Sequence, residues 1–239
     1  MPWSRQLHTL ALALPLLAGC GSDFVPFDPN QDSALRVIHG SPDTGPLDFI
    51  IGRSAQVAKS LQYPQAAGYS FVTEGTRTLS VRVAGTSTQL LAVDHSFVAN
   101  TSYTIAVAGL AGSLEAVVLT DADTPAPNGI FRLRVVRLAP FGPAMDFYVT
   151  APNADLSTAT PTSAGIVYKD VRGYVNLPTG TGQIRITEAG NPSNVFIDSK
   201  TRTFVNGQIS TIFIVGKPGK GGGGPPYAGQ FLGDGGLPD

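Results

Sequence analysis

The sequence predicts an all-β protein made of two tandem β-sandwich domains with immunoglobulin-like or Greek-key connections. Three observations support this: alternating apolar segments, many turn residues and an internal repeat. The 239 residues include 28 glycines and 19 prolines, and stretches with helical periodicity are absent. Short alternating segments separated by turn residues every 8–12 residues or so are typical of sandwiches and barrels.

Two segments illustrate the alternation, residues 77–83 and 101–107. In each, every second side chain is apolar: Leu79, Val81 and Val83 in the first, and Tyr103, Ile105 and Val107 in the second. A period of two is the pattern of a strand with one face buried. We expect about seven such strands in each domain, as in immunoglobulin-like sandwiches.

The second half of the chain repeats the first in the same order. Leu-Arg-Val-Ile at residues 35–38 returns as Leu-Arg-Val-Val at residues 133–136. Further pairs follow at similar spacing: Asp48 with Asp146, Tyr63 with Tyr168, Tyr69 with Tyr174, Gly75 with Gly180, and Phe97 with Phe204. A period of about 100 residues favours two tandem domains over a solenoid.

The repeat and the composition place the domain boundaries. The first copy spans residues 34–121 and the second spans residues 130–234. Residues 122–129 between them are proline-rich and lack large apolar side chains, which is typical of a short stiff linker.

The end of the second copy differs from the end of the first. Residues 217–226 are rich in glycine and proline, a composition that prevents regular strand pairing. We expect them to form a long loop inserted before the last strand; the alternative is that everything after Gly216 is a disordered tail. Residues 227–232 should then return to the second sheet and bury Phe231 or Leu232.

The chain begins with the pattern of a lipoprotein signal peptide, residues 1–19. Arg5 precedes a short apolar run that ends in Leu-Ala-Gly, and Cys20 follows as the only cysteine of the chain. The run is shorter than the 20 residues or so needed to span a bilayer. A plain secretory signal is the alternative, but it does not explain why the lone cysteine lies at the cleavage position. Residues 20–33 would form a tether between the lipid and the first strand.

The residues around Cys20 resemble a bacterial lipobox, in which the cysteine is acylated and becomes the new N-terminus. The membrane is therefore an expected partner, through the lipid on Cys20. Gly21 follows the cysteine. By resemblance to Gram-negative lipoproteins, this residue favours the outer membrane over retention at the inner membrane.

Charge and composition exclude several classes of function. Removing residues 1–19 removes Arg5 and shifts the formal net charge from −1 to −2. No basic stripe is present, so nucleic acid is not an expected partner. The mature chain keeps two histidines, His39 and His95, and no free thiol, too few for a zinc site. Asp121 and Asp123 lack the further ligands that calcium needs. We expect no metal and no cofactor.

Several residues of the first copy match a known family. They are the run Leu-Arg-Val-Ile-His-Gly-Ser-Pro-Asp at residues 35–43, then Asp48, Tyr63, Tyr69 and the turn at residues 74–76. With these residues the chain resembles the domain of unknown function 4397 family. The resemblance implies secreted or surface-anchored bacterial proteins with β-sandwich domains, and it carries no catalytic residues.

A hydrolase built on His39 and Ser41 is the least favoured function. The residue types of a nucleophilic triad are present, because Asp43 and Asp48 lie close by. However, residues 41–45 read as a turn between strands, and no G-x-S-x-G turn accompanies the serine. The second copy replaces His39 by Arg137 and loses the serine.

Four repeated residues are the candidate binding residues: Asp48, Asp146, Tyr69 and Tyr174. The tyrosines could stack on sugar rings, and the carboxylates could line a groove. The structural alternative is that the carboxylates accept backbone N–H groups and the tyrosines pack across strands.

The sequence therefore favours a non-enzymatic, lipid-anchored protein of the cell envelope. Its paired domains would serve as a binding or adhesion module for envelope polysaccharide or protein. The alternative is a structural spacer or assembly component of the envelope without a soluble ligand. A sandwich fold by itself cannot choose between these roles.

Replacing the cysteine tests the anchor. The Cys20→Ala variant should move from the membrane fraction to the soluble fraction, because the acyl chains would be missing. The measurement is fractionation of cells followed by immunoblotting. A variant that still partitions with membranes as the wild type does would refute lipid anchoring at this residue.

Overall fold

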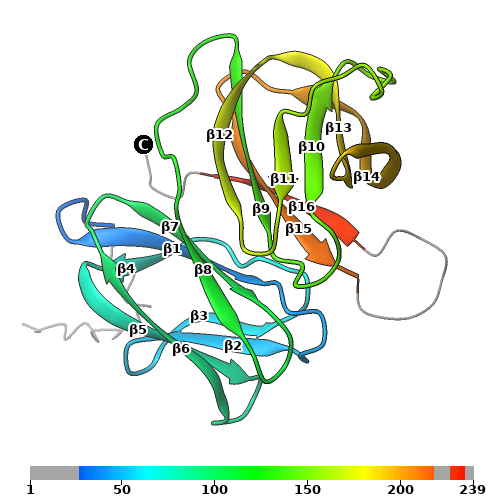
Figure 1. Cartoon of the computed structure of the whole chain (residues 1–239). Helices are drawn as coiled ribbons and strands as arrows, with labels where there is room; N and C mark the ends of the chain where they lie inside the picture. Colours follow the sequence, from blue (N-terminus) through cyan, green and yellow to red (C-terminus); the bar gives the residue numbers. More distant parts are fainter. Residues whose placement is uncertain (1–26, 218–226, 235–239) are drawn as a thin grey trace, which may run out of the picture.

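The computed structural model describes residues 27–217 and 227–234. It confirms the predicted fold class, because four sheets of four strands form two sandwich-like halves and none of these residues is helical. Figure 1 shows the first half at the lower left and the second half at the upper right. The signal peptide, Cys20 and the loop residues 218–226 lie outside the described residues.

The first half contains eight strands, one more than expected. They are β1 (Asp32–His39), β2 (Leu47–Ile51), β3 (Ala55–Leu61), β4 (Ser70–Thr73), β5 (Gly75–Val83), β6 (Gln89–Phe97), β7 (Ser102–Ala108) and β8 (Glu115–Thr120). They form one sheet in the order β4-β1-β7-β8 and another in the order β3-β2-β5-β6. All strand pairs are antiparallel except β1 with β7, which is parallel.

The second half has the same strand order as the first. Its strands are β9 (Ile130–Arg137), β10 (Met145–Thr150), β11 (Ser163–Ile166), β12 (Val171–Pro178), β13 (Gly180–Glu188), β14 (Asn191–Phe204), β15 (Ile209–Gly216) and β16 (Tyr227–Gly233). The sheets run β12-β9-β15-β16 and β11-β10-β13-β14, and the parallel pair recurs between β9 and β15. Each strand of the second half therefore corresponds to the strand of the first half whose number is lower by eight, for example β9 to β1.

Each half has its own apolar core between its two sheets. In the first half, Leu35, Phe49, Leu79 and Ile105 are fully buried in one cluster. In the second half, Leu133, Phe147, Ile186 and Ile212 form the equivalent cluster. These residues come from alternate positions of their strands, as the period of two predicts.

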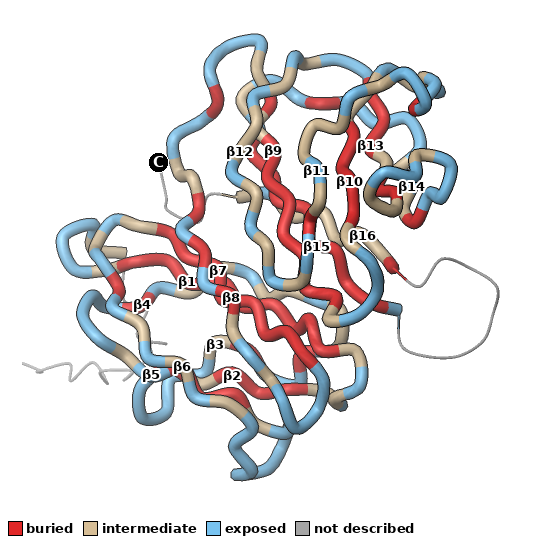
Figure 2. The backbone as a smooth tube through the Cα atoms, in the orientation of Figure 1, coloured by how far each residue is buried: buried red, intermediate tan, exposed pale blue. Residues whose placement is uncertain are grey.

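Two strands of each half are buried on both faces. All residues of β7 and β15 are buried, and β1 and β9 are buried almost throughout (Figure 2). Residues 102–107 form a strand as predicted, but the prediction that only one face of it is buried is wrong, because both faces are buried. A strand covered on both sides carries a near-continuous apolar run, because neither face meets water.

The second face is covered by the other half of the molecule. Sheet β4-β1-β7-β8 packs against sheet β12-β9-β15-β16, and we call these the two inner sheets. Ile38 and Leu119 of the first half share one buried cluster with Leu138 and Phe213 of the second. The two halves are joined by a third apolar core, in addition to the chain that links them.

The segment between the halves is also held in place. The amide of Ala126 donates to the carbonyl of Gly207 at 3.1 Å, and Ala126 is buried. Asp123 accepts from the amide of Ser102 at 3.1 Å. Residues 122–129 thus contact both halves.

The last strand pairs where the sequence placed a closing strand. β16 pairs antiparallel with β15, from Gly216 opposite Tyr227 to Ser210 opposite Gly233. Phe231 packs against the core of the second half, and Leu232 packs against the core between the halves. Both side chains are partly buried.

Within the described residues, no helix could cross a membrane.

Deleting residues 227–239 should destabilise the protein strongly, because β16 closes one inner sheet. A loss of about 3–5 kcal/mol would lower the melting temperature by roughly 10 °C in a chain of this size. Differential scanning calorimetry measures this directly. Deletion of residues 235–239 alone is the matched control and should leave the melting temperature unchanged. An equal melting temperature for both deletions would show that β16 contributes nothing.

Candidate functional site

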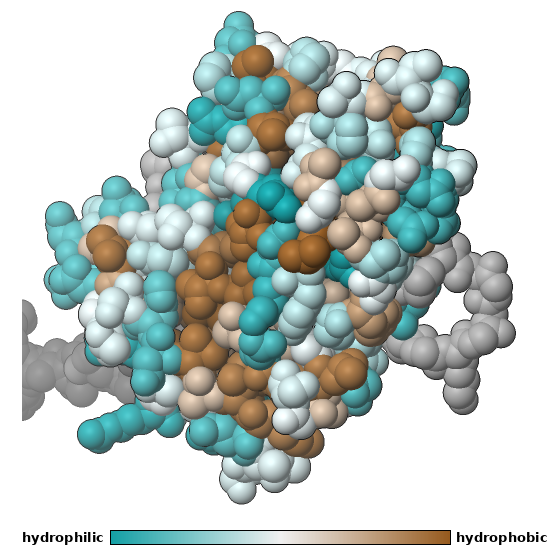
Figure 3. Space-filling view, viewed as in Figure 1, coloured by the Kyte–Doolittle hydropathy of each residue, from teal (hydrophilic) through white to brown (hydrophobic). Residues whose placement is uncertain are grey.

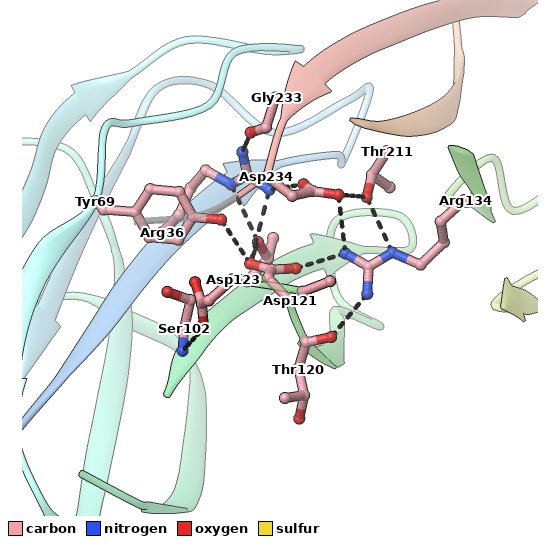
Figure 4. Close-up of polar contacts among 12 residues, drawn as sticks. Arg36, Tyr69, Ser102, Thr120, Asp121, Asp123, Arg134, Thr211, Gly233 and Asp234 are labelled. Carbon is pink, nitrogen blue, oxygen red and sulfur yellow. Dashed lines mark hydrogen bonds and ion pairs between the residues drawn. The ribbon is translucent and has the colours of Figure 1, made fainter. Parts of the chain in front are cut away.

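A buried network of two arginines and two aspartates lies between the halves (Figure 4). Arg36 lies on β1, and Arg134 lies at the equivalent position on β9. Asp121 directly follows β8, and Asp234 directly follows β16. The four side chains are at most 5% exposed, so four charges are held between the two inner sheets.

The two shortest ion pairs cross from one half to the other: Arg36 with Asp234 at 2.7 Å and Arg134 with Asp121 at 2.5 Å. Two longer pairs at 3.7 Å lie within a half, Arg36 with Asp121 and Arg134 with Asp234. Each guanidinium also donates to a backbone carbonyl beside its partner aspartate, at Gly233 and at Thr120. Because each contact has a counterpart with the halves exchanged, the interface is self-complementary, as in a twofold dimer.

Each aspartate is held in place by hydroxyl groups of its own half. The donors are Tyr69 and Thr104 for Asp121 (2.7 and 2.5 Å), and Tyr174 and Thr211 for Asp234 (2.8 and 2.5 Å). The same threonines accept a hydrogen bond from the arginine Nε of their half. The tyrosine rings lie against the guanidinium groups, with 4.7 and 4.6 Å from Cζ to ring centroid, in the range of cation–π contacts.

Burial is the main cause of the pKa shifts of Asp121, Tyr69 and Tyr174. It raises the pKa of Asp121 above its usual range, although Arg134 and Arg36 oppose this shift. Burial also raises the pKa of Tyr69 and of Tyr174, and the neighbouring carboxylates add to it. Both phenols therefore remain neutral donors at neutral pH. The charged side chains of the network are almost fully buried between the halves.

The candidate binding tyrosines make contacts within the protein. Tyr69 and Tyr174 are partly buried and belong to the network described above. Tyr63 and Tyr168, the other repeated pair, are also partly buried and pack against the core between the halves. These contacts are those of the packing alternative.

In each half, the candidate binding carboxylate links a neighbouring strand, β3 or β11, to a turn. Asp48 accepts from the amides of Ser60 and Gly85, at 2.7 and 2.9 Å. The amide of Ser60 is the main cause that lowers the pKa of Asp48. In the second half, the equivalent donors to Asp146 are the amides of Gly165 and Gly190, at 2.8 and 2.9 Å. Each carboxylate is engaged by backbone donors, which is the structural role weighed in the sequence.

His39 and Ser41 do not form a catalytic pair. His39 Nε2 lies 3.0 Å from the carbonyl of Gly45 and 3.3 Å from Thr44 Oγ1. Ser41 donates instead to Asp43 Oδ1 at 3.3 Å, and the same oxygen accepts from the amide of Ala111. Burial lowers the pKa of His39 below its usual value. These residues hold the loop between β1 and β2.

The second half uses an arginine for the same task. Arg137 occupies the position of His39 and is 1% exposed. Its guanidinium donates to carbonyls of the loop between β9 and β10 and to one on β11: Phe141, Gly142, Pro143 and Ile166. Because Arg137 holds this loop, the second copy does not need the His-x-Ser-Pro-Asp run that holds the equivalent loop of the first copy.

The part of the chain that the structure describes holds no group of three or more His, Cys, Asp or Glu residues suited to a metal ion. Asp121 and Asp123, which the sequence places close together, point to different partners. Asp121 faces the arginines, and Asp123 accepts from the amide of Ser102.

An apolar groove opens at the outer end of the second half, where β10 and β12 end. It has a volume of about 270 Å³. Apolar side chains dominate its walls, with threonines at the rim: Val149, Leu177, Pro178, Phe204, Thr150, Thr179 and Thr181. Gly182 lies on its floor, where any Cβ would come within 2.5 Å of the Phe204 ring. We refer to this site as the apolar groove.

The first half has a smaller hollow at the equivalent place, about 190 Å³. Arg77 stands there in place of Gly182, as the strand registers show. Phe71 lines it and contacts the ring of Phe27 at 4.8 Å between centroids. The chain from the N-terminus therefore reaches the first half beside this hollow.

The surface at the junction is partly apolar. Figure 3 shows apolar side chains gathered along β8, where the two halves meet. Val118 of β8 is 38% exposed, and Val167 and Val171 are exposed on the facing part of the second half. Tyr168 and Lys169 contact Glu115 across this junction.

Residues 33–148 match a family described as "Domain of unknown function (DUF4397)". The match supports the resemblance drawn from the sequence. It covers the first half and the first two strands of the second half, β9 and β10. No curated protein matches the chain.

The solved structures that resemble this chain include two whose descriptions name maltoheptaose or an alpha-glucan. The first is CBMbc (family CBM26) from Eubacterium rectale Amy13K in complex with maltoheptaose, 13% identical, covering 82% of this chain and 96% of that chain, with a TM-score of 0.24. The second bears the description "Alpha-glucan binding by a streptococcal virulence factor", 10% identical, covering 76% and 92%, with a TM-score of 0.25. A leucine-rich repeat protein from Bacteroides thetaiotaomicron is 12% identical, covering 78% and 26%, with a TM-score of 0.22.

The sequence analysis missed the crossed ion pairs although a signal was present. Arg36 and Arg134 interrupt apolar strands at the same position of both copies. A charged residue repeated within a buried strand indicates a buried partner, because an unpaired buried charge is very costly. The partners, Asp121 and Asp234, likewise stand at matching positions after the last strand of each copy.

Replacing one charged residue of the network should lower the free energy of unfolding far more than replacing both residues of an ion pair. Asp234→Asn leaves buried Arg36 with only the more distant carboxylate of Asp121, and loss of one partner of a buried pair costs about 3–5 kcal/mol. The double variant Arg36→Met with Asp234→Asn should cost less than the sum of the two single changes. Urea unfolding measures all three free energies. The control Glu115→Gln breaks an exposed pair and should not shift the midpoint. If the losses of unfolding free energy in the two single variants simply added up to the loss in the double variant, the two residues would not be coupled.

Proposed function

We propose that this chain is a non-enzymatic binding module of the bacterial cell envelope, anchored by a lipid on Cys20. Its ligand would be an envelope polysaccharide or an envelope protein, bound at the outer end of the second half. The observation that carries this proposal is the apolar groove. It is larger, and its lining as a whole is more apolar, than the hollow at the equivalent place of the first half, where Arg77 replaces Gly182.

The position of the N-terminus supports this choice of surface. Phe27 contacts Phe71 at the hollow of the first half, so the tether from Cys20 would arrive at that end. The apolar groove belongs to the other half, and Figure 1 shows the ends of β10 and β12 at the top of the view. A protein anchored in this way would direct the apolar groove away from the lipid.

The interface between the halves supports presentation by a rigid body. The crossed ion pairs and the third apolar core fix one half against the other. A preorganised binding surface loses less conformational entropy when it binds than a flexible pair of modules does.

The contacts of the hydrolase candidates favour binding over catalysis. His39 and Ser41 each bond to residues of their own loop and not to each other. A triad needs the serine and its base within hydrogen-bond reach, with the base held by a third group. A hydrolase therefore receives no support from this geometry.

A structural spacer is the second candidate, and one observation favours it. The repeated tyrosines Tyr69 and Tyr174 are packed into the interface, as a spacer requires, and are not displayed in a groove. A spacer would need the rigid joint between the halves but no free apolar groove. The two functions therefore predict different effects of blocking that groove.

Blocking the apolar groove distinguishes the two functions. Thr181→Trp places a large ring at its rim, and Thr76→Trp makes the same change at the equivalent exposed position of the first half. Lipidated bait would be crosslinked in intact envelopes, and bound polysaccharide and protein would be quantified. We expect a partner recovered with wild type and Thr76→Trp but lost with Thr181→Trp. Recovery that is equal for all three, or absent for all three, would refute the binding module and favour the spacer.

A further inference from the structure

A second groove lies next to the apolar groove and has a different chemistry. It has a volume of about 210 Å³, room for about seven waters at ~30 Å³ each. Phe204 lines both grooves. Aromatic and aliphatic side chains form one part of its wall, and polar groups form the rest: Phe131, Ile184, Phe231, Leu232, Arg202, Thr203, Gln208 and Ser210. We call it the Arg202 groove.

Arg202 is a free cation held at this groove. Its Cζ lies 3.8 Å from the centroid of the Phe231 ring, so stacking on the ring orients the guanidinium. Among the described residues, no hydrogen-bond acceptor or carboxylate engages its side chain. A guanidinium with its donors unoccupied can take a carboxylate through two parallel hydrogen bonds.

Ser210 adds a hydroxyl without a protein hydrogen-bond partner. The residue lines the groove and is 5% exposed as a whole. Within the described part of the chain, its side chain makes no hydrogen bond. A ligand that reaches this hydroxyl can therefore bond to it without displacing a protein group.

The first half closes the equivalent space with aromatic rings. The strand registers place Tyr103 at the position of Ser210 and His95 at the position of Arg202. His95, Phe97 and Tyr103 contact each other with 4.8 to 5.3 Å between ring centroids. The Arg202 groove therefore exists because a serine and an arginine replace two rings that fill the same place.

We propose that the Arg202 groove binds an acidic sugar of a polysaccharide, with the carboxylate on Arg202. The apolar and aromatic wall suits the C–H face of a sugar ring. The Ser210 hydroxyl and the Gln208 amide suit its hydroxyl groups. This inference rests on the proposed function and deepens it, because it assigns the chemical class of the ligand at the same end of the molecule.

Calorimetric titration of the full chain carrying Cys20→Ala tests the assignment. The probes are oligogalacturonate and its methyl ester, which has the same rings without the charge. We expect oligogalacturonate to bind at least tenfold more tightly than the ester. Equal binding of the two probes, or no binding of oligogalacturonate, would overturn the proposal. Displacement of oligogalacturonate by inorganic phosphate at the same concentration would also overturn it, because a bare anion would then suffice.

Three variants locate the binding. Arg202→Gln removes the cation, and Ser210→Tyr fills the groove as the first half does; each should weaken oligogalacturonate binding at least tenfold. Lys59→Gln is the control, since it removes one exposed positive charge from β3 of the first half. Melting temperatures within a few degrees of wild type show that the variants fold. Unchanged affinity in folded Arg202→Gln would refute this site. If that variant still captures a partner that Thr181→Trp loses, the proposed function stands and only the acidic-sugar assignment fails.

Discussion

The crossed pairs Arg36–Asp234 and Arg134–Asp121 are the interaction on which the arrangement of this molecule depends. Burying four charges is costly, and the shortest ion pair of each arginine, which offsets this cost, is formed with the opposite half. Within its own half, each arginine meets only a more distant carboxylate, at 3.7 Å. The network therefore specifies one relative orientation of the halves, while the apolar core around Phe213 and Leu138 provides the non-directional attraction.

This interface between the halves explains the roles of several residues that are repeated in the sequence. Tyr69 and Tyr174 serve as neutral donors and ring partners inside the joint. Asp48 and Asp146 each connect a strand and a turn of their own half by accepting backbone amides. Residues that both halves retain thus maintain the shared architecture. Functional differences between the halves must arise where the halves diverge.

The divergence is concentrated at the outer ends of the sandwiches. Gly182 stands where the first half has Arg77, and Ser210 stands where the first half has Tyr103. Both replacements remove side-chain volume from the second half, and both lie beside Phe204. Since well-packed interiors leave few voids larger than a water molecule, two adjoining grooves at one end favour a role in binding.

The sequence by itself determined the fold class, because apolar alternation with a period of two requires a sheet with a buried face. Its repeated order also predicted corresponding strands, and residues 227–232 contained the closing strand despite the glycine-rich stretch before them. Only the tertiary structure decided that Ala106 and Phe213 face the other half, because periodicity cannot say what covers the second face of a strand. It also decided that Arg36 pairs with Asp234, some 200 residues away. Such a pairing depends on how two finished domains dock, and no local pattern in the chain encodes that geometry.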